Sequence, residues 1–349
     1  MQQKNGIQVF QLKRWIQINM TDYKDIKGQL IQTLAADPSN PPNGQVWYNS
    51  TSNTLKGFKN ILAAWATGNN VNNARSQGMG AGSQTAALFS GGQNGVYPAP
   101  FSNHTELYNG TNWTEVNNLN TARRLTAGCG ASNTAALAFG GYDGGNNSET
   151  ETWNGTNWTE VNNMNEAKRQ IGASGTNTAA LTCGGEAPGG ATANTEIWNG
   201  TNWTEVNNLN NAKADNAMSN SGTTTASITF GGIPVPARHR ETELWNGTNW
   251  TEVNDLNTGR QRLGGIGVST AALAYGGDKE PAPYSADTEI WNGTNWTETS
   301  NLSAARSFLQ GAGTYTVGVA FAGETGTAIS AATEEFTGAS TPTVEFDLS

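Results

Sequence analysis

A unit of about 46 residues repeats along most of this chain, and the repeat limits the possible folds more than any other feature. The phrase W-N-G-T-N-W-T-E recurs, with Tyr108 in place of the first Trp in one copy. The second Trp of the phrase stands at Trp113, Trp158, Trp203, Trp250 and Trp296. Because the spacing stays at 45 to 47 residues, one small structural unit is expected to form again and again.

Two further positions mark the repeat and extend it to six copies. An apolar run ending in Gly-Gly closes the first half of each unit, with Ala322-Gly323 as the one departure. A degenerate first copy begins at Trp65, where WATGNNVNNAR matches WTEVNNLNTAR at Trp113. A basic residue follows ten positions after the Trp in every copy: Arg75, Arg123, Lys168, Lys213, Arg260 and Arg306.

Each unit contains four segments of strand length bounded by Gly, Asn or Pro. In the second copy they are RLTAGCGAS, NTAALAFGG, SETETW and WTEVNNL, and the N-G-T-N between the last two favours a tight hairpin. Such a unit cannot bury both faces alone, whereas units stacked around a closed ring can. The sequence therefore predicts an all-β, six-bladed β-propeller with a short N-terminal extension.

The last unit lacks a fourth strand after Phe336. We predict that the C-terminal TPTVEFDLS, residues 341–349, supplies it, and residues 61–67 are the rival for that place. The expected division is an N-terminal extension and linker at 1–45, a short β-hairpin at 46–60 and the propeller at 61–349.

The succession of features within a unit is similar to the kelch repeat. An apolar strand ends in Gly-Gly, a Glu-x-aromatic follows in the next strand, and a Trp and then a basic residue come after it. The resemblance covers roughly residues 60 to 348 and implies the propeller fold. It does not single out a function, because kelch propellers include oxidases, scaffolds and ligand binders.

Two sets of repeated side chains are interpreted as structural. A Glu in the third segment of each unit is expected to be buried and to form a blade-to-blade ion pair with a repeated basic residue. The aromatic residue two positions later is expected to pack between blades rather than to stack on a sugar. The Glu residues are Glu106, Glu151, Glu196, Glu243, Glu289 and Glu334. The aromatic residues are Tyr108, Trp153, Trp198, Trp245, Trp291 and Phe336.

The loops after Gly-Gly differ in every unit, whereas the N-G-T-N hairpins hardly change. Variation on one face of a repeat scaffold favours that face as the binding face. Aromatic and charged residues in these loops are the candidate ligand-binding residues: Tyr97, Phe101, Tyr142, Arg238, His239 and Tyr284.

Enzymatic chemistry finds little support, and we expect a non-enzymatic protein without metal or cofactor. The copper site of kelch-type oxidases needs at least two His with Tyr ligands, and the two His of this chain, His104 and His239, fall in units across the ring. The same scarcity leaves little room for a Ser-His-Asp arrangement. Cys129 and Cys183 lie in apolar runs and are expected to be buried free thiols.

The bulk charge also restricts the partners. A net charge of −9 opposes binding to nucleic acid, which needs clustered Lys and Arg. No run of about 18 apolar residues is present, so we expect no membrane insertion.

The N-terminal part of the chain reads differently from the repeats. After a Pro-Ser-Asn-Pro-Pro linker, GQVWYNSTSNTLKGF predicts a hairpin with a polar turn. This string is similar to short hairpin modules of structural proteins, including tail and fibre components, of marine tailed phages. The resemblance implies attachment to other virion proteins through the N-terminal segment.

Together these features predict a phage virion structural or adhesin-like protein that uses its propeller for surface binding or decoration, with a host surface glycan or protein as partner. The expected location is the virion. The alternative is a lectin-like or protein-binding kelch propeller of bacterial origin, in the cytoplasm or at the cell surface.

Overall fold

The computed structural model describes residues 31–95, 98–233, 240–279, 281, 284–340 and 343–346. The chain divides into two compact units. Unit 1 comprises residues 1–63 and 339–349, and unit 2 comprises residues 64–338. Every regular element in the described ranges is a β-strand, as the repeat predicted.

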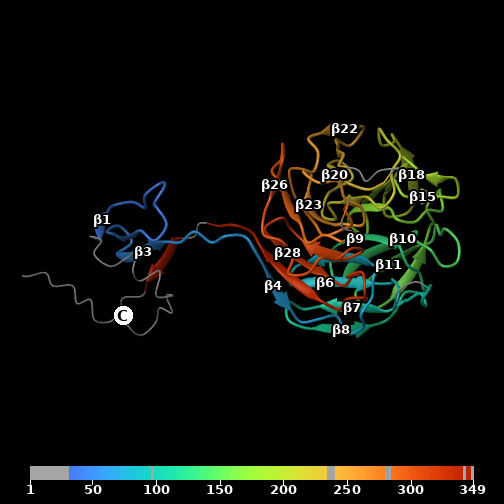
Figure 1. Cartoon of the computed structure of the whole chain (residues 1–349), viewed down its shortest axis with the longest axis horizontal. Coiled ribbons are helices and arrows are strands. Elements are labelled where there is room, and N and C mark those ends of the chain that lie inside the picture. Colours follow the sequence, from blue (N-terminus) through green and yellow to red (C-terminus); the bar gives the residue numbers. More distant parts are fainter. Residues whose placement is uncertain are drawn as a thin grey trace, which may run out of the picture. The chain divides into compact units, whose positions relative to one another are not determined.

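Unit 2 contains six four-stranded antiparallel sheets, which we call blades 1 to 6 (Figure 1). Blade 1 consists of β5 (Met79–Ser83), β6 (Ala86–Ser90), β7 (Thr105–Tyr108) and β8 (Trp113–Val116). Blade 2 consists of β9 (Ala127–Ser132), β10 (Ala135–Phe139), β11 (Thr150–Trp153) and β12 (Trp158–Val161). Blade 3 consists of β13 (Gly172–Gly175), β14 (Ala180–Cys183), β17 (Thr195–Trp198) and β18 (Trp203–Val206).

The second half of unit 2 repeats the arrangement. Blade 4 consists of β19 (Ala217–Met218), β20 (Ser227–Phe230), β21 (Thr242–Trp245) and β22 (Trp250–Val253). Blade 5 consists of β23 (Gly264–Val268), β24 (Ala271–Tyr275), β25 (Thr288–Trp291) and β26 (Trp296–Glu298). Blade 6 consists of β27 (Gln310–Gly313), β28 (Val317–Phe321), β29 (Thr333–Thr337) and β4 (Ala64–Gly68).

The first strands of the blades meet at the centre of unit 2. Each first strand contacts the first strand of the next blade, in the order β5, β9, β13, β19, β23 and β27, and β27 contacts β5. The ring is therefore closed, and no first strand is left as an open edge. One extra hairpin, β15 (Glu186–Ala187) with β16 (Gly190–Ala191), extends the loop of blade 3.

The predicted closing strand is wrong, and the rival segment takes its place. β4 pairs with β29 and sets Trp65 opposite Phe336, whereas β30 (Thr343–Phe346) pairs with β3 in unit 1. The segment with Trp65 takes this place because the two outer strands of every blade carry a pair of packed aromatic residues. Trp65 packs 5.0 Å from Phe336, ring centre to ring centre, as Trp158 does against Trp153 at 5.4 Å. The C-terminal segment has no Trp to offer.

The second Trp of each repeat also links neighbouring blades. Its indole N–H donates to the hydroxyl of the Thr that opens the third strand of the preceding blade, for example Trp158 to Thr105 at 3.0 Å and Trp296 to Thr242 at 3.0 Å. The first aromatic residue is buried in every blade. The repeated aromatics therefore belong to the packing between and within blades, as predicted.

Unit 1 is a small sheet built from both ends of the chain. Its strand order is β1 (Gln32–Leu34), β2 (Val46–Asn49), β3 (Thr54–Phe58) and β30. β2 and β3 form the hairpin that the sequence indicated. Asp37 accepts hydrogen bonds from the buried Trp47 and from Asn49 and Lys56. These bonds hold the pKa of Asp37 at about 2. Residues 339–349 thus belong to unit 1 rather than to the propeller.

Candidate functional site

The two kinds of loop that the sequence distinguished lie at different ends of the strands. Because the strands are antiparallel, the loops after Gly-Gly and the connectors between successive blades lie at the same end of the first strands. We call this end of unit 2 the variable rim. It is the candidate functional surface.

Buried ion pairs hold the frame of the variable rim. The structure brings every predicted Glu to its basic partner, and both side chains of each pair are buried. The N–O distances are 3.1 Å for Arg75–Glu106, 3.1 Å for Arg123–Glu151, 3.5 Å for Lys168–Glu196, 2.9 Å for Lys213–Glu243, 2.7 Å for Arg260–Glu289 and 2.7 Å for Arg306–Glu334.

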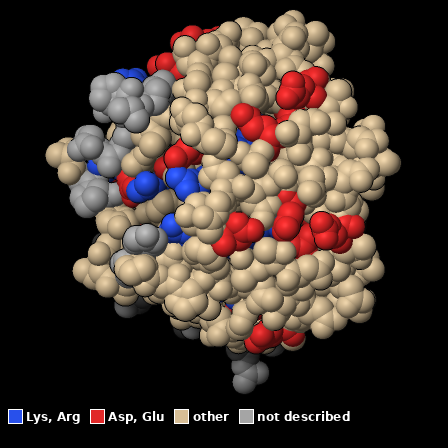
Figure 2. All heavy atoms as spheres, turned by 90° about the vertical axis from the view of Figure 1, so that its right-hand side faces the viewer, with Lys and Arg blue, Asp and Glu red and all other residues tan. Residues whose placement is uncertain are grey.

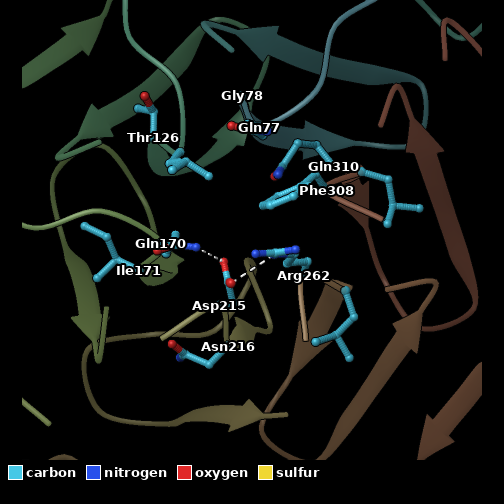
Figure 3. A pocket seen from close by; sticks show the side chains of 13 residues that line it. Gln77, Gly78, Thr126, Gln170, Ile171, Asp215, Asn216, Arg262, Phe308 and Gln310 are labelled. Atoms are coloured by element: carbon cyan, nitrogen blue, oxygen red, sulfur yellow. Dashed lines mark hydrogen bonds and ion pairs between the residues drawn. The ribbon is translucent and has the colours of Figure 1, made fainter. Parts of the chain in front are cut away.

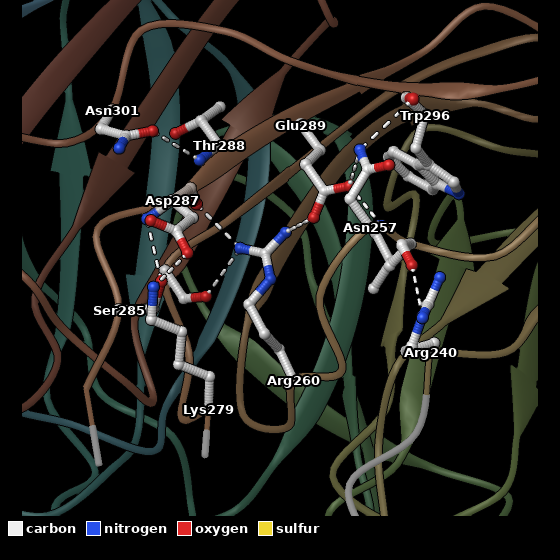
Figure 4. Close-up of polar contacts among 12 residues, drawn as sticks. Arg240, Asn257, Arg260, Lys279, Ser285, Asp287, Thr288, Glu289, Trp296 and Asn301 are labelled. Atoms are coloured by element: carbon white, nitrogen blue, oxygen red, sulfur yellow. Dashed lines mark hydrogen bonds and ion pairs between the residues drawn. The ribbon is translucent and has the colours of Figure 1, made fainter. Parts of the chain in front are cut away.

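Figure 4 shows the hydrogen bonds of the blade-5 pair. Arg260 donates to Glu289 and to the main-chain oxygens of Gly276 and Asp287. The other carboxylate oxygen of Glu289 accepts from the main-chain and side-chain N–H groups of Asn257, in the connector from blade 4. Burial lowers the pKa of Arg260, and the charge of Glu289 opposes that shift.

Each basic residue also joins two blades, because its main chain and its side chain have partners on different sheets. The main-chain oxygen of Arg260 accepts from Gly232 N–H of blade 4, while its side chain binds blade 5. The same donor position is used in every blade, and its φ lies between 94° and 108°. Only Gly adopts this conformation without strain, which explains the second Gly of the repeated pair.

At the centre of the variable rim, main-chain hydrogen bonds between successive blades form a closed ring. We call the central opening that this ring surrounds the pore. One residue of each blade donates its N–H to the oxygen of the equivalent residue of the preceding blade, at 2.6 to 3.3 Å. All six are non-glycine residues with φ between 51° and 62°. We call them the pore ring: Gln77, Leu125, Gln170, Asp215, Arg262 and Phe308. Non-glycine residues held in the left-handed region often mark functional sites.

The six side chains of the pore ring are of five different types, unlike those of the buried ion pairs, which repeat in every blade. Asp215 accepts from Gln170 at 2.7 Å and from Arg262 at 3.0 Å (Figure 3). Arg262 also binds Asp278 at 3.1 Å. Burial raises the pKa of Asp215, and Arg262 counteracts the shift. The guanidinium of Arg262 lies 4.5 Å from the ring centre of Phe308.

The pore ring lines a cavity of about 80 Å³. That volume admits a few water molecules or one small chemical group, whereas pockets for whole small-molecule ligands usually exceed about 300 Å³. A larger partner would therefore spread over the surrounding rim.

On the rim beside the pore, blades 1 to 3 contribute to an aromatic and basic cluster. Phe101 and Tyr142 pack edge to face with ring centres 5.8 Å apart. The guanidinium carbons of Arg124 and Arg169 lie 5.2 Å and 4.9 Å from the centre of the Tyr142 ring. Arg169 pairs with Glu186 at 2.7 Å. We call Phe101, Arg124, Tyr142, Arg169 and Glu186 the rim cluster.

The structure places three of the six predicted ligand-binding residues, and their binding role stays a prediction. Phe101 and Tyr142 meet in the rim cluster. Tyr284 is half-buried and its ring lies over Gly326 in the loop of blade 6, and burial raises its pKa. Tyr97, Arg238 and His239 lie outside the described residues.

Sequence reasoning missed Arg124 and Arg169. Each directly follows a repeated basic residue, and the six residues at this position are Ser76, Arg124, Arg169, Ala214, Gln261 and Ser307. Variation at a fixed position next to an unvarying one was the signal that could have found them.

The N-G-T-N hairpins use their polar groups internally. Asn154 Oδ1 accepts from the main-chain N–H groups of Thr156 and Asn157, at 2.9 Å each. Asn117 of blade 1 donates to Thr156 O at 3.0 Å and to Asn157 Oδ1 at 2.8 Å in blade 2. Equivalent bonds recur around the ring, from Asn162, Asn207 and Asn254.

The surface view adds the charge distribution (Figure 2). On the face shown, most of the visible Lys and Arg atoms gather in one area, and Asp and Glu atoms lie both beside that area and over the rest of the face. Cys129 and Cys183 are buried free thiols. Among the described residues, no group of three His, Cys, Asp or Glu side chains is arranged to hold a metal ion. The same part of the chain contains no helix that is long and apolar enough to cross a membrane.

Comparison with known proteins shows the fold of the chain. No protein-family model matches the sequence. No curated protein matches it either. Among the solved structures that match is one described as the structure of YjhT, with a TM-score of 0.63 and 12% sequence identity. The match covers 78% of this chain and 99% of that one. The prediction of an all-β propeller is confirmed.

Proposed function

We propose that the chain is a non-enzymatic binding protein of a phage virion, with the propeller as its binding module. In this proposal unit 1 attaches the chain to other virion proteins, and the variable rim contacts or decorates a surface. The observation that carries the proposal is the contrast within the repeats. Six blades share one buried frame, yet the residues that the frame presents at the variable rim differ from blade to blade.

A repeated frame with varied surface residues suits binding better than catalysis. Binding surfaces concentrate on loops held by a rigid scaffold. The rim cluster has the composition of an energetically important contact site, because Tyr and Arg are enriched among such residues.

The construction of unit 1 supports an attachment role. Its sheet takes three strands from one end of the chain and one from the other, so both ends of the propeller lead into it.

Virion attachment is tested on purified particles of the phage whose genome encodes the chain. We expect mass spectrometry to detect the protein in the particles, and antibodies against the propeller to label them in negative-stain electron microscopy. Absence from particles, with the protein present in the infected cells, would overturn the virion role.

The binding role is tested by replacing the 94–100 loop with a Gly/Ser linker in the full chain, which leaves Gln93 and Phe101 in place. We expect the thermal unfolding midpoint to change little, because exposed loops tolerate such changes, and binding to host cells to fall. The matched control is Thr156→Ala at a hairpin tip. Binding that is unchanged by the loop replacement but lost in the control would show that the hairpin side is the working face.

A further inference from the structure

The outer edge of blade 6 differs from the outer edges of the other five blades. The fourth strand of each blade has no further strand beside it among the described elements. In blades 1 to 5, the residue of this strand that lies opposite the buried Glu of the third strand is an exposed Glu. These residues are Glu115, Glu160, Glu205, Glu252 and Glu298. In blade 6 the same position is Thr67, opposite Glu334, so β4 is the one outer strand of the six described blades without a charged side chain.

An exposed charge protects an edge strand from pairing with another strand. The protection is greatest against a second copy of the same strand, because like charges repel each other across a sheet. Two copies of β8, for example, would each bring Glu115 to the shared edge. β4 lacks this protection, and its exposed side chains, Ala64, Ala66 and Thr67, are small. Its outer main-chain N–H and C=O groups are therefore open to another strand.

Apolar side chains are exposed beside this edge. Trp65 is partly exposed, whereas the equivalent Trp residues of the other five blades are buried. Val317 is 47% exposed, and the sheet register runs from Val317 through Thr337 to Ala64 at the edge. A strand added to β4 would cover part of this apolar surface, which favours an interaction site here.

The sequence of β4 is suited to pairing with itself. When two identical strands pair antiparallel about a twofold axis, residues at equal distances before and after the axis lie opposite each other. With the axis at Ala66, Trp65 lies opposite Thr67 of the second copy. Ala64 then lies opposite Gly68, and no pair contains a charge. The same register in the outer strand of any other blade would bring two Glu carboxylates to one face of the shared sheet.

We propose that two copies of the chain associate through β4, antiparallel to each other, and join their sixth blades into one eight-stranded sheet. This inference is independent of the proposed binding role of the variable rim. One such contact uses the uncharged outer edge of both propellers, and the Glu residues of the other blades oppose further contacts of this kind. The partner is therefore one second copy rather than a growing array. Because a single short strand makes the contact, we expect a weak dimer.

The test measures the mass of the full chain by sedimentation equilibrium over a series of concentrations. We expect the mass to rise with concentration from that of one chain toward that of two. Thr67→Glu restores the residue of the other five blades and should weaken the dimer about tenfold or more, since two like charges are added at one edge. The matched control is Thr114→Glu, which adds the same charge to the exposed outer strand of blade 1 and should change the dissociation constant less than about twofold.

Cross-linking tests the contact itself. Ala66→Cys places two thiols opposite each other at the proposed axis, where mild oxidation should join the two copies by a disulfide. Thr114→Cys is the control and should give little product, and the native thiols, Cys129 and Cys183, are buried. A chain that stays monomeric at every concentration, or a dimer that Thr67→Glu weakens no more than Thr114→Glu does, would overturn the proposal. Equal cross-linking of the two Cys variants would overturn it as well.

Discussion

The N-G-T-N hairpins and the loops after Gly-Gly belong to the same blades, yet they use their polar groups in opposite ways. In the hairpins, Asn154 closes the turn and Asn157 accepts a hydrogen bond from the preceding blade. A substitution there breaks a bond that the fold requires. In the loops, the bonds that the fold requires come from the main chain of the second Gly and from the buried ion pairs beneath it.

This difference explains why the two loop sets vary so differently along one sequence. Where main-chain hydrogen bonds and a buried ion pair hold the fold, the neighbouring side chains can differ from blade to blade. The pore ring shows this most clearly, because its six residues share one main-chain conformation and one hydrogen-bond pattern while their side chains include Leu, Gln, Asp, Arg and Phe.

The largest expected effect tests whether the buried pairs carry the frame. Glu289→Ala should lower the free energy of unfolding by about 3 to 5 kcal/mol, because it leaves the buried Arg260 without its carboxylate. The matched control is Glu298→Ala. Glu298 lies directly opposite Glu289 in the sheet but is exposed, so its loss should cost less than about 0.5 kcal/mol. Equal costs, measured by urea unfolding, would mean that the frame does not depend on the pairs.

The second prediction concerns the second Gly of the repeated pair, whose N–H donates to the main-chain oxygen of the basic residue in the connector, as Gly323 does to Arg75. Gly323→Ala should cost about 2 kcal/mol or more, because φ is 101° and the new Cβ would lie 2.7 Å from Ser307 O. The preceding residue is already Ala322, with φ of 63°. Ala322→Gly should therefore change stability by less than about 1 kcal/mol, since relief of strain and loss of chain rigidity oppose each other. Thermal unfolding of both variants separates the two positions, and a reversed order would refute the assignment.

The third prediction addresses the hairpins. Asn154→Ala should cost about 1 kcal/mol, since it removes the acceptor of two main-chain N–H groups at an exposed turn. Thr156→Ala changes the same exposed turn but keeps the main-chain oxygen that Asn117 uses, and should cost less than about 0.5 kcal/mol. Neither variant should alter binding to host cells. A loss of binding in either would move the working surface to the hairpins.

The sequence predicted most of the frame because the frame repeats. A Glu and a basic residue at constant positions in every unit must meet in all of them or in none, and the same holds for the paired aromatics. The closing strand occurs once, so no other copy could decide between two short apolar segments. Trp65 was the deciding residue, because it places a Trp opposite Phe336, as the other blades place a Trp opposite the aromatic residue of their third strand.

The rim cluster could be predicted only in part for a different reason. Phe101 and Tyr142 stood out as aromatics in variable loops, but Arg124 and Arg169 lie in connectors that otherwise form the frame. Their meeting depends on three blades and on main-chain positions that are not local in sequence. Such a contact can be identified only from the three-dimensional arrangement of the blades.

The smallest expected effect lies on the variable rim itself. Lys279 pairs with Asp287 in the loop of blade 5, and both side chains are partly exposed. Burial alone would raise the pKa of Asp287, but hydrogen bonds from Lys279 and Ser285 and the charges of Lys279 and Arg260 outweigh it and lower the pKa. This pair therefore stabilises the fold above the ordinary Asp pKa of about 4, and the contribution is lost as pH falls through the lowered value. Lys279→Ala should cost less than about 1 kcal/mol at pH 7 and make the unfolding midpoint less dependent on pH below about 4. If Lys279→Ala lowered the free energy of unfolding as much as Glu289→Ala, the exposed ion pair of the rim would stabilise the fold as strongly as a buried pair of the frame. The proposed difference between rim and frame would then be wrong.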